Sequence, residues 1–219
     1  MLTDIHNGQR VLYFGAEENQ AHLIVILLHG RGSNAQSMLP LAKSLSMKGI
    51  RFILPQAALN RWYPQTAFGP LEANEPDLSS ALKLIDRLVK DSHLKGFSNQ
   101  QIVFGGFSQG ACLASEYVAR NAKRYAGLFV LSGALIGPPN TPRNYSGSLN
   151  NMSVFIGGSD VDPWVSLNLI RDTAQEFTKL EAEVDLRIYP GMEHTINQNE
   201  IDRVRTLLSN EDNLEIKDV

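Results

Sequence analysis

The sequence predicts one α/β domain with a mostly parallel, doubly wound central sheet, helices on both faces and no large lid. Two observations predict this fold class. Short apolar segments bounded by Gly, Pro or Asn alternate with amphipathic patterns, as strands and helices do in such sheets. The length of 219 residues also suits one large domain, and we find no repeat, low-complexity segment or linker that would divide residues 1–219.

Several short segments have the composition of strands. Residues 11–14 and the alternating segment 184–188 suit strands near the edges of the sheet. The others are apolar on both sides, which is typical of central parallel strands covered by helices. They are Leu23–Leu28 and residues 51–54, 102–104, 128–131 and 154–156.

Helices are predicted where apolar residues recur at helical spacing. One such stripe follows Pro76, a residue favoured in the first turn of a helix, and two more lie in the last third of the chain. The stripes are Leu78, Ala81, Leu82, Ile85 and Leu88; Leu167, Ile170, Ala174 and Phe177; and Ile201, Val204 and Leu208. The long connections 55–74 and 135–152 are predicted as loops, and such folds place their binding surfaces on loops beyond the strands.

Composition argues against several classes of partner. A net charge of −3, with 20% charged residues, gives no reason to expect nucleic acid or an anionic membrane as a partner. The longest purely aliphatic run, Leu23–Leu28, is far shorter than the roughly 20 residues that span a bilayer. Stable membrane insertion is therefore not expected.

The start of the chain and its cysteine content predict a cytoplasmic protein. The first twenty residues contain Asp4, Glu17 and Glu18 and no long apolar segment, so no secretory signal is recognised. The single cysteine, Cys112, excludes an internal disulfide and fits a reducing compartment.

Gly106-Phe107-Ser108-Gln109-Gly110 is the most informative segment. It follows an apolar run and predicts a strand, a sharp turn and a helix that starts near Gln109. A non-glycine residue at such a turn is strained, and its side chain stands clear of the sheet. Ser108 could then attack a carbonyl if a base accepts its proton. Because Gly-x-Ser-x-Gly also occurs in tight turns without chemistry, the interpretation depends on its partners.

One of the five histidines suits the role of base. Four have simpler assignments: His6 and His93 at the surface, His22 at the start of a strand, and His29 in a glycine-rich turn. His194 follows the last predicted strand and leads into the final helix. That position is at the same edge of the sheet as the serine, so His194 is the candidate base.

The orienting carboxylate is expected just beyond an intermediate strand. Asp160 and Asp162 both follow the strand at 154–156, and both qualify on position alone. Taken by itself, Asp162 before Pro163 is a common way to cap a helix. The order serine, aspartate, histidine is that of α/β-hydrolases, and with the other two partners present it favours Asp162.

The developing oxyanion needs backbone donors. The expected ones are the N–H of Gln109, directly after the serine, and the N–H of Arg31, in the turn after Leu23–Leu28. The side chain of Arg31 can be simply solvated, since only the amide is required. Cys112 is interpreted as a buried packing residue. No metal-site spacing or phosphate loop is present, so we expect neither metal nor cofactor.

With these residues identified, the sequence resembles the phospholipase/carboxylesterase family of small serine hydrolases, which includes the acyl-protein thioesterases. The resemblance covers nearly the whole chain. Its motifs are 27–32 (LLHGRG), 105–111 (GGFSQGA), 157–163 (GGSDVDP) and 191–194 (GMEH).

The resemblance implies an α/β-hydrolase fold with almost no lid and ester hydrolysis without a cofactor. It implies a triad of Ser108, Asp162 and His194, with Asp162 preferred to Asp160 because the family's acid directly precedes the position of Pro163. It also implies that the two backbone amides named above form the oxyanion hole.

The segments 61–64, 68–72 and 75–79 look more like the bacterial carboxylesterase branch than the thioesterase branch. Two positions depart from the family pattern: Arg31 stands where an apolar residue is common, and Ser166 stands where a proline often follows the aspartate. Candidate pocket residues, for which ordinary packing is an equally good interpretation, are Trp62, Tyr63, Phe68, Leu71 and Trp164.

The leading hypothesis is a carboxylic-ester hydrolase that forms an acyl-enzyme on Ser108 and prefers small or short-to-medium acyl esters. An acyl-protein thioesterase could use the same triad. A dienelactone-type hydrolase is disfavoured because those enzymes usually carry a cysteine nucleophile. From another class, a non-catalytic ligand-binding protein could share the fold. Apolar residues in exposed loops could support a homodimer.

Overall fold

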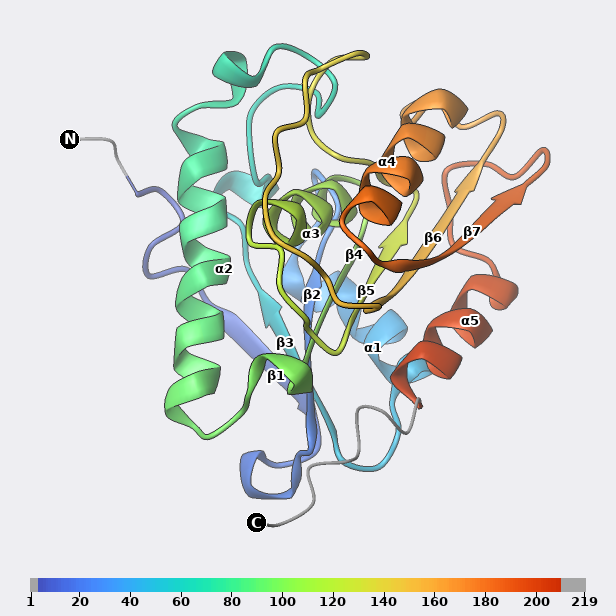
Figure 1. Cartoon of the computed structure of the whole chain (residues 1–219). Helices are drawn as coiled ribbons and strands as arrows, with labels where there is room; N and C mark the ends of the chain where they lie inside the picture. Colours follow the sequence, from blue (N-terminus) through green and yellow to red (C-terminus); the bar gives the residue numbers. More distant parts are fainter. Residues whose placement is uncertain (1–3, 210–219) are drawn as a thin grey trace.

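The computed structural model describes residues 4–209 and contains one seven-stranded sheet in the order β1-β3-β2-β4-β5-β6-β7 (Figure 1). Only β1 runs antiparallel to its neighbour, at one edge; the other pairs are parallel. The strands are β1 (Val11–Gly15), β2 (Leu23–Leu28), β3 (Ile50–Pro55), β4 (Ile102–Phe107), β5 (Gly127–Leu131), β6 (Ser153–Ser159) and β7 (Glu183–Tyr189).

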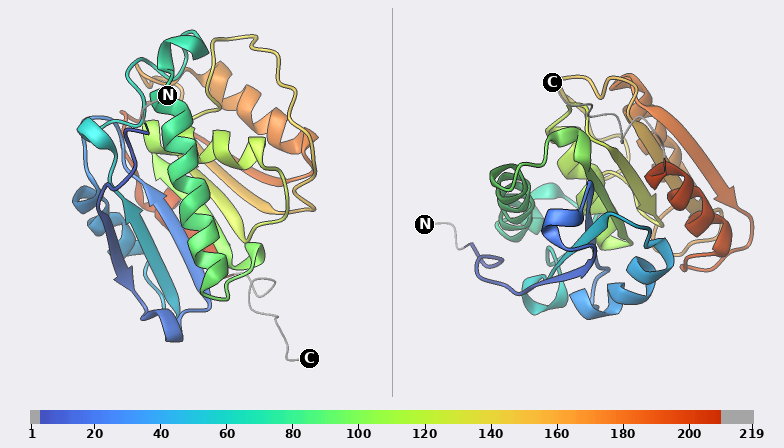
Figure 2. Two further views of the ribbon diagram at one scale, coloured as in Figure 1. Left: turned by 90° about the vertical axis from the view of Figure 1, so that its left-hand side faces the viewer. Right: turned by 90° about the horizontal axis from the view of Figure 1, so that it is seen from below.

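Helices cover both faces of the sheet, as the two further views show (Figure 2). Apolar residues of α2 (Asp77–Leu94), α3 (Gln109–Arg120) and α4 (Leu167–Lys179) belong to one core cluster. Those of α1 (Leu39–Leu45) and α5 (Gln198–Leu208) belong to a second. The sheet therefore separates two apolar layers, and the predicted doubly wound α/β-hydrolase architecture is confirmed.

All the predicted strands and helices are present, and most of the strands extend beyond their predicted ends. The central strands are almost entirely buried, as their apolar composition on both sides predicts. One helix was not predicted. Helix α1 has seven residues, with Pro40 near its start, and is too short to show a clear apolar period. The connection 55–74 contains two short 3₁₀ turns, Ala58–Asn60 and Leu71–Asn74.

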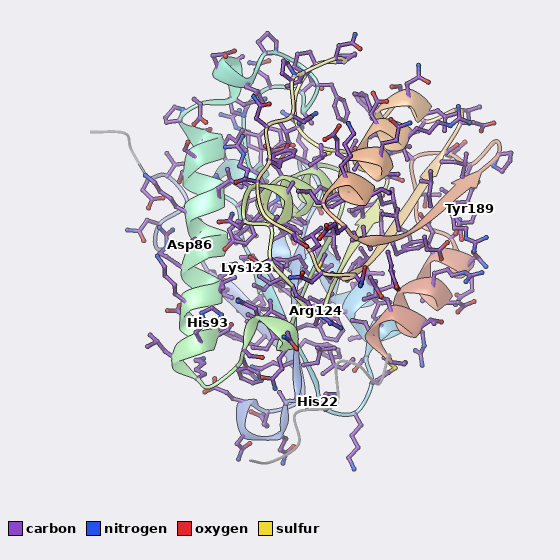
Figure 3. The ribbon with its side chains drawn as sticks, in the orientation of Figure 1. His22, Asp86, His93, Lys123, Arg124 and Tyr189 are labelled. Carbon is purple, nitrogen blue, oxygen red and sulfur yellow. The ribbon has the colours of Figure 1, made fainter. Side chains whose placement is uncertain are left out.

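The parallel strands end at a common edge, so the loops after β2, β4, β6 and β7 meet there. Two of the histidines, His22 and His93, lie towards the opposite edge, in the lower half of Figure 3. No helix within residues 4–209 has the length and apolar character needed to cross a membrane.

Candidate active site

Ser108 occupies a strained turn between β4 and α3. Its φ of 55° and ψ of −122° lie outside the regions that non-glycine residues normally adopt. Glycines on both sides allow the close packing this turn requires. A Cβ at Gly106 would lie 2.6 Å from the carbonyl carbon of Gly110, and one at Gly110 would lie 2.2 Å from the carbonyl oxygen of Leu28. The turn holds the serine hydroxyl beyond the end of the sheet.

A continuous series of hydrogen bonds joins Ser108, His194 and Asp162. The distance from Ser108 Oγ to His194 Nε2 is 2.9 Å, and that from His194 Nδ1 to Asp162 Oδ2 is 2.6 Å. Because a carboxylate only accepts, Nδ1 carries the hydrogen and Nε2 accepts the serine hydroxyl. The aspartate side chain is fully buried, and that of the histidine is 17% exposed. The imidazole is therefore fixed in the tautomer that a general base needs.

The structure separates the two aspartates that position alone left open. Asp162 uses Oδ2 for the histidine and Oδ1 to accept the backbone N–H groups of Trp164 (2.8 Å) and Val165 (3.2 Å). It therefore stabilises a turn and orients the imidazole at once. Asp160 instead accepts the N–H of Gly191 at 2.8 Å, so it holds the loop that carries the histidine.

The loop of His194 is also anchored to the start of α5. The Phe107 ring packs against the imidazole, with centroids 4.9 Å apart. Further along, Asn197 and Glu200 form a reciprocal cap, in which Glu200 Oε2 accepts the N–H of Asn197 at 2.9 Å. Glu200 is fully buried, its Oε1 has no hydrogen-bond partner, and burial raises its pKa to about 7.

His29 holds the turn expected to supply an oxyanion donor. Its ring is fully buried; Nε2 accepts the N–H of Ala57 at 3.1 Å and Nδ1 donates to the carbonyl of Gly30 at 2.8 Å. A trans peptide directs its carbonyl and N–H in opposite directions, so this bond turns the N–H of Arg31 away from the His29 ring. A Cβ at Gly30 would lie 3.4 Å from Ser108 Cβ, which places this peptide beside the serine.

The second expected donor, the N–H of Gln109, belongs to the first turn of α3, where amides have no intrahelical acceptor. The Gln109 side chain has a separate structural task. Its Oε1 accepts the N–H of Trp62 and its Nε2 donates to the carbonyl of Tyr63, both at 2.9 Å. The turn that carries Ser108 and the segment that begins at Trp62 are thereby held together.

The prediction that His6 lies at the surface is wrong. Its ring is fully buried, its Nδ1 accepts the N–H of Ala58 at 3.0 Å, and its Nε2 donates to the carbonyl of Trp62 at 2.9 Å. Burial lowers the pKa of His6 and of His29. The polar sequence around His6 gave no sign of this, because its apolar surroundings come from distant parts of the chain. His93, by contrast, lies exposed against Asn99.

A cavity of about 920 Å³ opens at Ser108 and His194. Of the candidate pocket residues, Phe68 and Trp164 line it, and Trp164 is 70% exposed at its rim. Trp62 and Tyr63 do not line it; both are fully buried, and the Trp62 indole donates to the carbonyl of His29 at 2.8 Å. Leu71 packs against the core and is also absent from the lining.

The side chain of Arg31 is not simply solvated, contrary to the prediction from the sequence. Its guanidinium donates to the carbonyls of Pro64 and Gln65, the first at 2.6 Å. It therefore joins the β2 turn to one wall of the cavity. Cys112 also lines the cavity, but it is 2% exposed and burial raises its pKa to about 11. A protonated thiol at this position fits its predicted packing role better than that of a nucleophile.

Across the described part of the chain, no group of three or more His, Cys, Asp or Glu side chains could hold a metal ion. The fold and the Ser–His–Asp series together are those of a hydrolase of the α/β-hydrolase class.

Comparison with known proteins identifies the family within that class. Residues 13–211 match the family model described as Phospholipase/Carboxylesterase, so the chain belongs to this family. A phospholipase/carboxylesterase from Dyadobacter fermentans has a similar crystal structure, with a TM-score of 0.88 and 36% identity over 92% of this chain and 97% of that one.

More distant relatives include both esterases and thioesterases. Acyl-protein thioesterase 1 of Saccharomyces cerevisiae is 25% identical over 92% of this chain and 97% of its own length. The Bacillus cereus carboxylesterase shares the fold, with a TM-score of 0.72 and 20% identity over 91% of this chain and 93% of that one.

Proposed function

We propose that the protein hydrolyses carboxylic esters through an acyl-enzyme on Ser108, with His194 as general base and Asp162 as the orienting acid. The observation that carries the proposal is the hydrogen-bonded series from Ser108 Oγ through the imidazole to a buried carboxylate, at the opening of a cavity. Membership of the phospholipase/carboxylesterase family supports it.

In the first half-reaction, His194 Nε2 accepts the hydroxyl proton as Ser108 Oγ attacks the ester carbonyl. The carbonyl oxygen becomes an oxyanion, which the N–H groups of Arg31 and Gln109 stabilise. The imidazolium, stabilised by Asp162, then protonates the leaving alcohol as the ester bond breaks. Water repeats the sequence on the acyl-enzyme, releases the acid and restores the serine. The cycle needs no cofactor.

The cavity suits small or short-to-medium acyl groups, with Phe68 and Trp164 as binding residues. Thioester hydrolysis is a second candidate, because the yeast relative named above is an acyl-protein thioesterase. Turnover of hexanoyl oxygen esters and hexanoyl thioesters that share a leaving-group skeleton would separate the two activities. A kcat/KM at least tenfold higher for the thioester would replace the ester assignment.

A fluorophosphonate probe tests the proposal against the non-catalytic binding alternative. The probe reacts with an activated serine, so we expect stoichiometric labelling of the wild-type protein at Ser108 and none in Ser108→Ala. Unlabelled wild-type protein that also fails to hydrolyse p-nitrophenyl acetate would favour a ligand-binding role.

We also propose that the protein is cytoplasmic, since its single cysteine is buried and unpaired. Homodimer formation is proposed from three exposed apolar side chains in the connections between strands and helices, Leu59, Val161 and Trp164. Sedimentation of the purified protein tests it, and a single monomeric species at micromolar concentration would contradict it.

A further inference from the structure

The cavity has two apolar walls, which continue from the two core layers on opposite faces of the sheet. We call the first the α1–α5 wall; it belongs with the layer under α1 and α5 and consists of Met38, Leu41, Phe107, Ile196 and Ile201. We call the second the 64–68 wall; it belongs with the layer under α2, α3 and α4 and includes Ala67, Phe68, Cys112 and Val165. Ser108 lies at the end of β4, between the two.

The chemistry of the proposed reaction distinguishes these walls. When the ester bond breaks, His194 Nε2 must reach the leaving oxygen to donate its proton. The leaving group therefore lies on the side of the imidazole, and the acyl chain extends away from it. The imidazole packs against Phe107 at 4.9 Å, and Ile196 follows it by two residues. Both belong to the α1–α5 wall, so this wall faces the leaving group.

The α1–α5 wall offers nothing to a charged leaving group. Among the described residues that line the cavity, only Arg31 carries a permanent charge, and its guanidinium reaches the opposite side, at Pro64 and Gln65.

Three serines line the cavity near this wall, and their hydroxyls have partners within their own segments. Ser33 and Ser37 are hydrogen-bonded to each other, and Ser44 donates to the carbonyl of Pro40. A charged group here would find no side chain of opposite charge and no hydroxyl hydrogen free to bond to it.

We propose that the α1–α5 wall is the binding site for an apolar leaving group, and that the substrates are esters of alkyl or aryl alcohols. Esters whose alcohol carries a phosphate, an ammonium group or several free hydroxyls are disfavoured. This inference rests on the proposed ester hydrolysis and adds to it the chemical class of the alcohol.

Two matched series of esters test the assignment. In one, the acyl group is butyryl and the alcohol is methanol, butanol, hexanol or choline; in the other, the alcohol is ethanol and the acyl group varies from acetyl to octanoyl. We expect kcat/KM to rise from methyl to hexyl butyrate and to be on the order of tenfold lower for choline butyrate than for hexyl butyrate.

Variants on the two walls provide the cross-check. Ile201→Ser should reduce the ratio of kcat/KM for hexyl and methyl butyrate by about tenfold and leave the dependence on acyl length unchanged. Phe68→Ser, on the opposite wall, should weaken the dependence of kcat/KM on acyl length and leave the ratio for hexyl and methyl butyrate unchanged. Ile196→Ser is a second variant on the α1–α5 wall, in case Ile201→Ser fails to give a cooperative thermal unfolding transition.

Equal hydrolysis of choline and hexyl butyrate, or a change in alcohol preference in Phe68→Ser alone, would overturn the assignment while ester hydrolysis stands. Absence of hydrolysis of every ester, together with an unlabelled Ser108, would overturn the proposed function as well.

Discussion

His29 and His194 both lie in loops beyond the carboxyl end of a parallel strand, His29 directly after β2 and His194 a few residues after β7, yet their surroundings differ completely. His29 is fully buried and both ring nitrogens are bonded to backbone groups. His194 is 17% exposed at the side chain, and its nitrogens face a carboxylate and a hydroxyl. The groups opposite the two ring nitrogens, rather than position at the sheet edge, therefore determine what a histidine can do.

The difference extends to protonation. A proton on His29 Nε2 would remove the acceptor of the Ala57 N–H inside the core, and burial lowers the pKa of this ring. A proton on His194 Nε2 is part of the proposed reaction, because Asp162 stabilises the imidazolium. The His29 ring is suited to hold a peptide in place, whereas in the proposed reaction the His194 ring accepts and donates a proton in each half-reaction.

Loss of Ser108 or His194 should have the greatest effect on activity. Ser108→Ala and His194→Ala should each lower kcat by a factor on the order of 10⁶, and the double variant should be little worse, because triad members act as a unit. Steady-state kinetics with p-nitrophenyl butyrate measures this. A single variant that kept one tenth of the wild-type activity would exclude that residue from the triad.

Glu200 provides a buried titratable group in the segment next to His194, with a pH dependence opposite in sign to that of His29. Burial raises its pKa from 4.5 to about 7, so the folded state binds a proton more tightly than the unfolded chain. The stability it contributes is complete below about pH 4.5 and is lost as pH rises towards 7, a change of about 3 kcal/mol.

Glu200→Gln should remove that dependence. Urea unfolding at pH 5 and pH 8 should show the variant gaining about 3 kcal/mol relative to wild type at the higher pH. His29 acts in the other direction, because its lowered pKa makes stability decline as pH falls below the unfolded value of 6.5. Parallel pH profiles for wild type and Glu200→Gln would contradict the assignment.

His29→Ala tests whether His29 positions the Gly30–Arg31 peptide. Without the bond from Nδ1, the Gly30–Arg31 peptide loses its fixed orientation, and we expect kcat to fall by about 10² with little change in KM. The unpaired Ala57 N–H should also lower the free energy of unfolding by about 1–3 kcal/mol. His93→Ala, an exposed histidine at the other edge, is the matched control. A folded His29→Ala variant with wild-type kcat would contradict the positioning role.

The pH dependence of kcat/KM tests the assignment of His194 as the base. The base must accept the serine proton at Nε2, so we expect kcat/KM to be lower in acid than at neutral pH. His29→Ala should retain the same acid limb at its lower overall rate. A wild-type profile that stays flat down to pH 4, on a substrate whose chemistry limits the rate, would contradict the role of His194.

Much of the fold and the candidate triad could be predicted from local sequence. Neighbouring residues predict the apolar strands, the helical stripes and the turn between two glycines, because backbone geometry and periodic burial depend on short stretches of chain. The order of Ser108, Asp162 and His194 along the chain predicts that they converge. The short helix α1, with Pro40 near its start, lacked enough turns to show such a pattern.

The doubly wound sheet, the strained turn at Ser108 and His194 as the candidate base follow from local sequence and chain order. The burial of His6, the bond from the Gly191 N–H to Asp160 and the absence of Trp62 from the cavity lining emerge only from the folded structure. These outcomes depend on which distant segments surround a side chain. Burial and hydrogen-bond geometry arise from contacts between distant segments of the fold, so the residues next to a side chain in the sequence do not predict them.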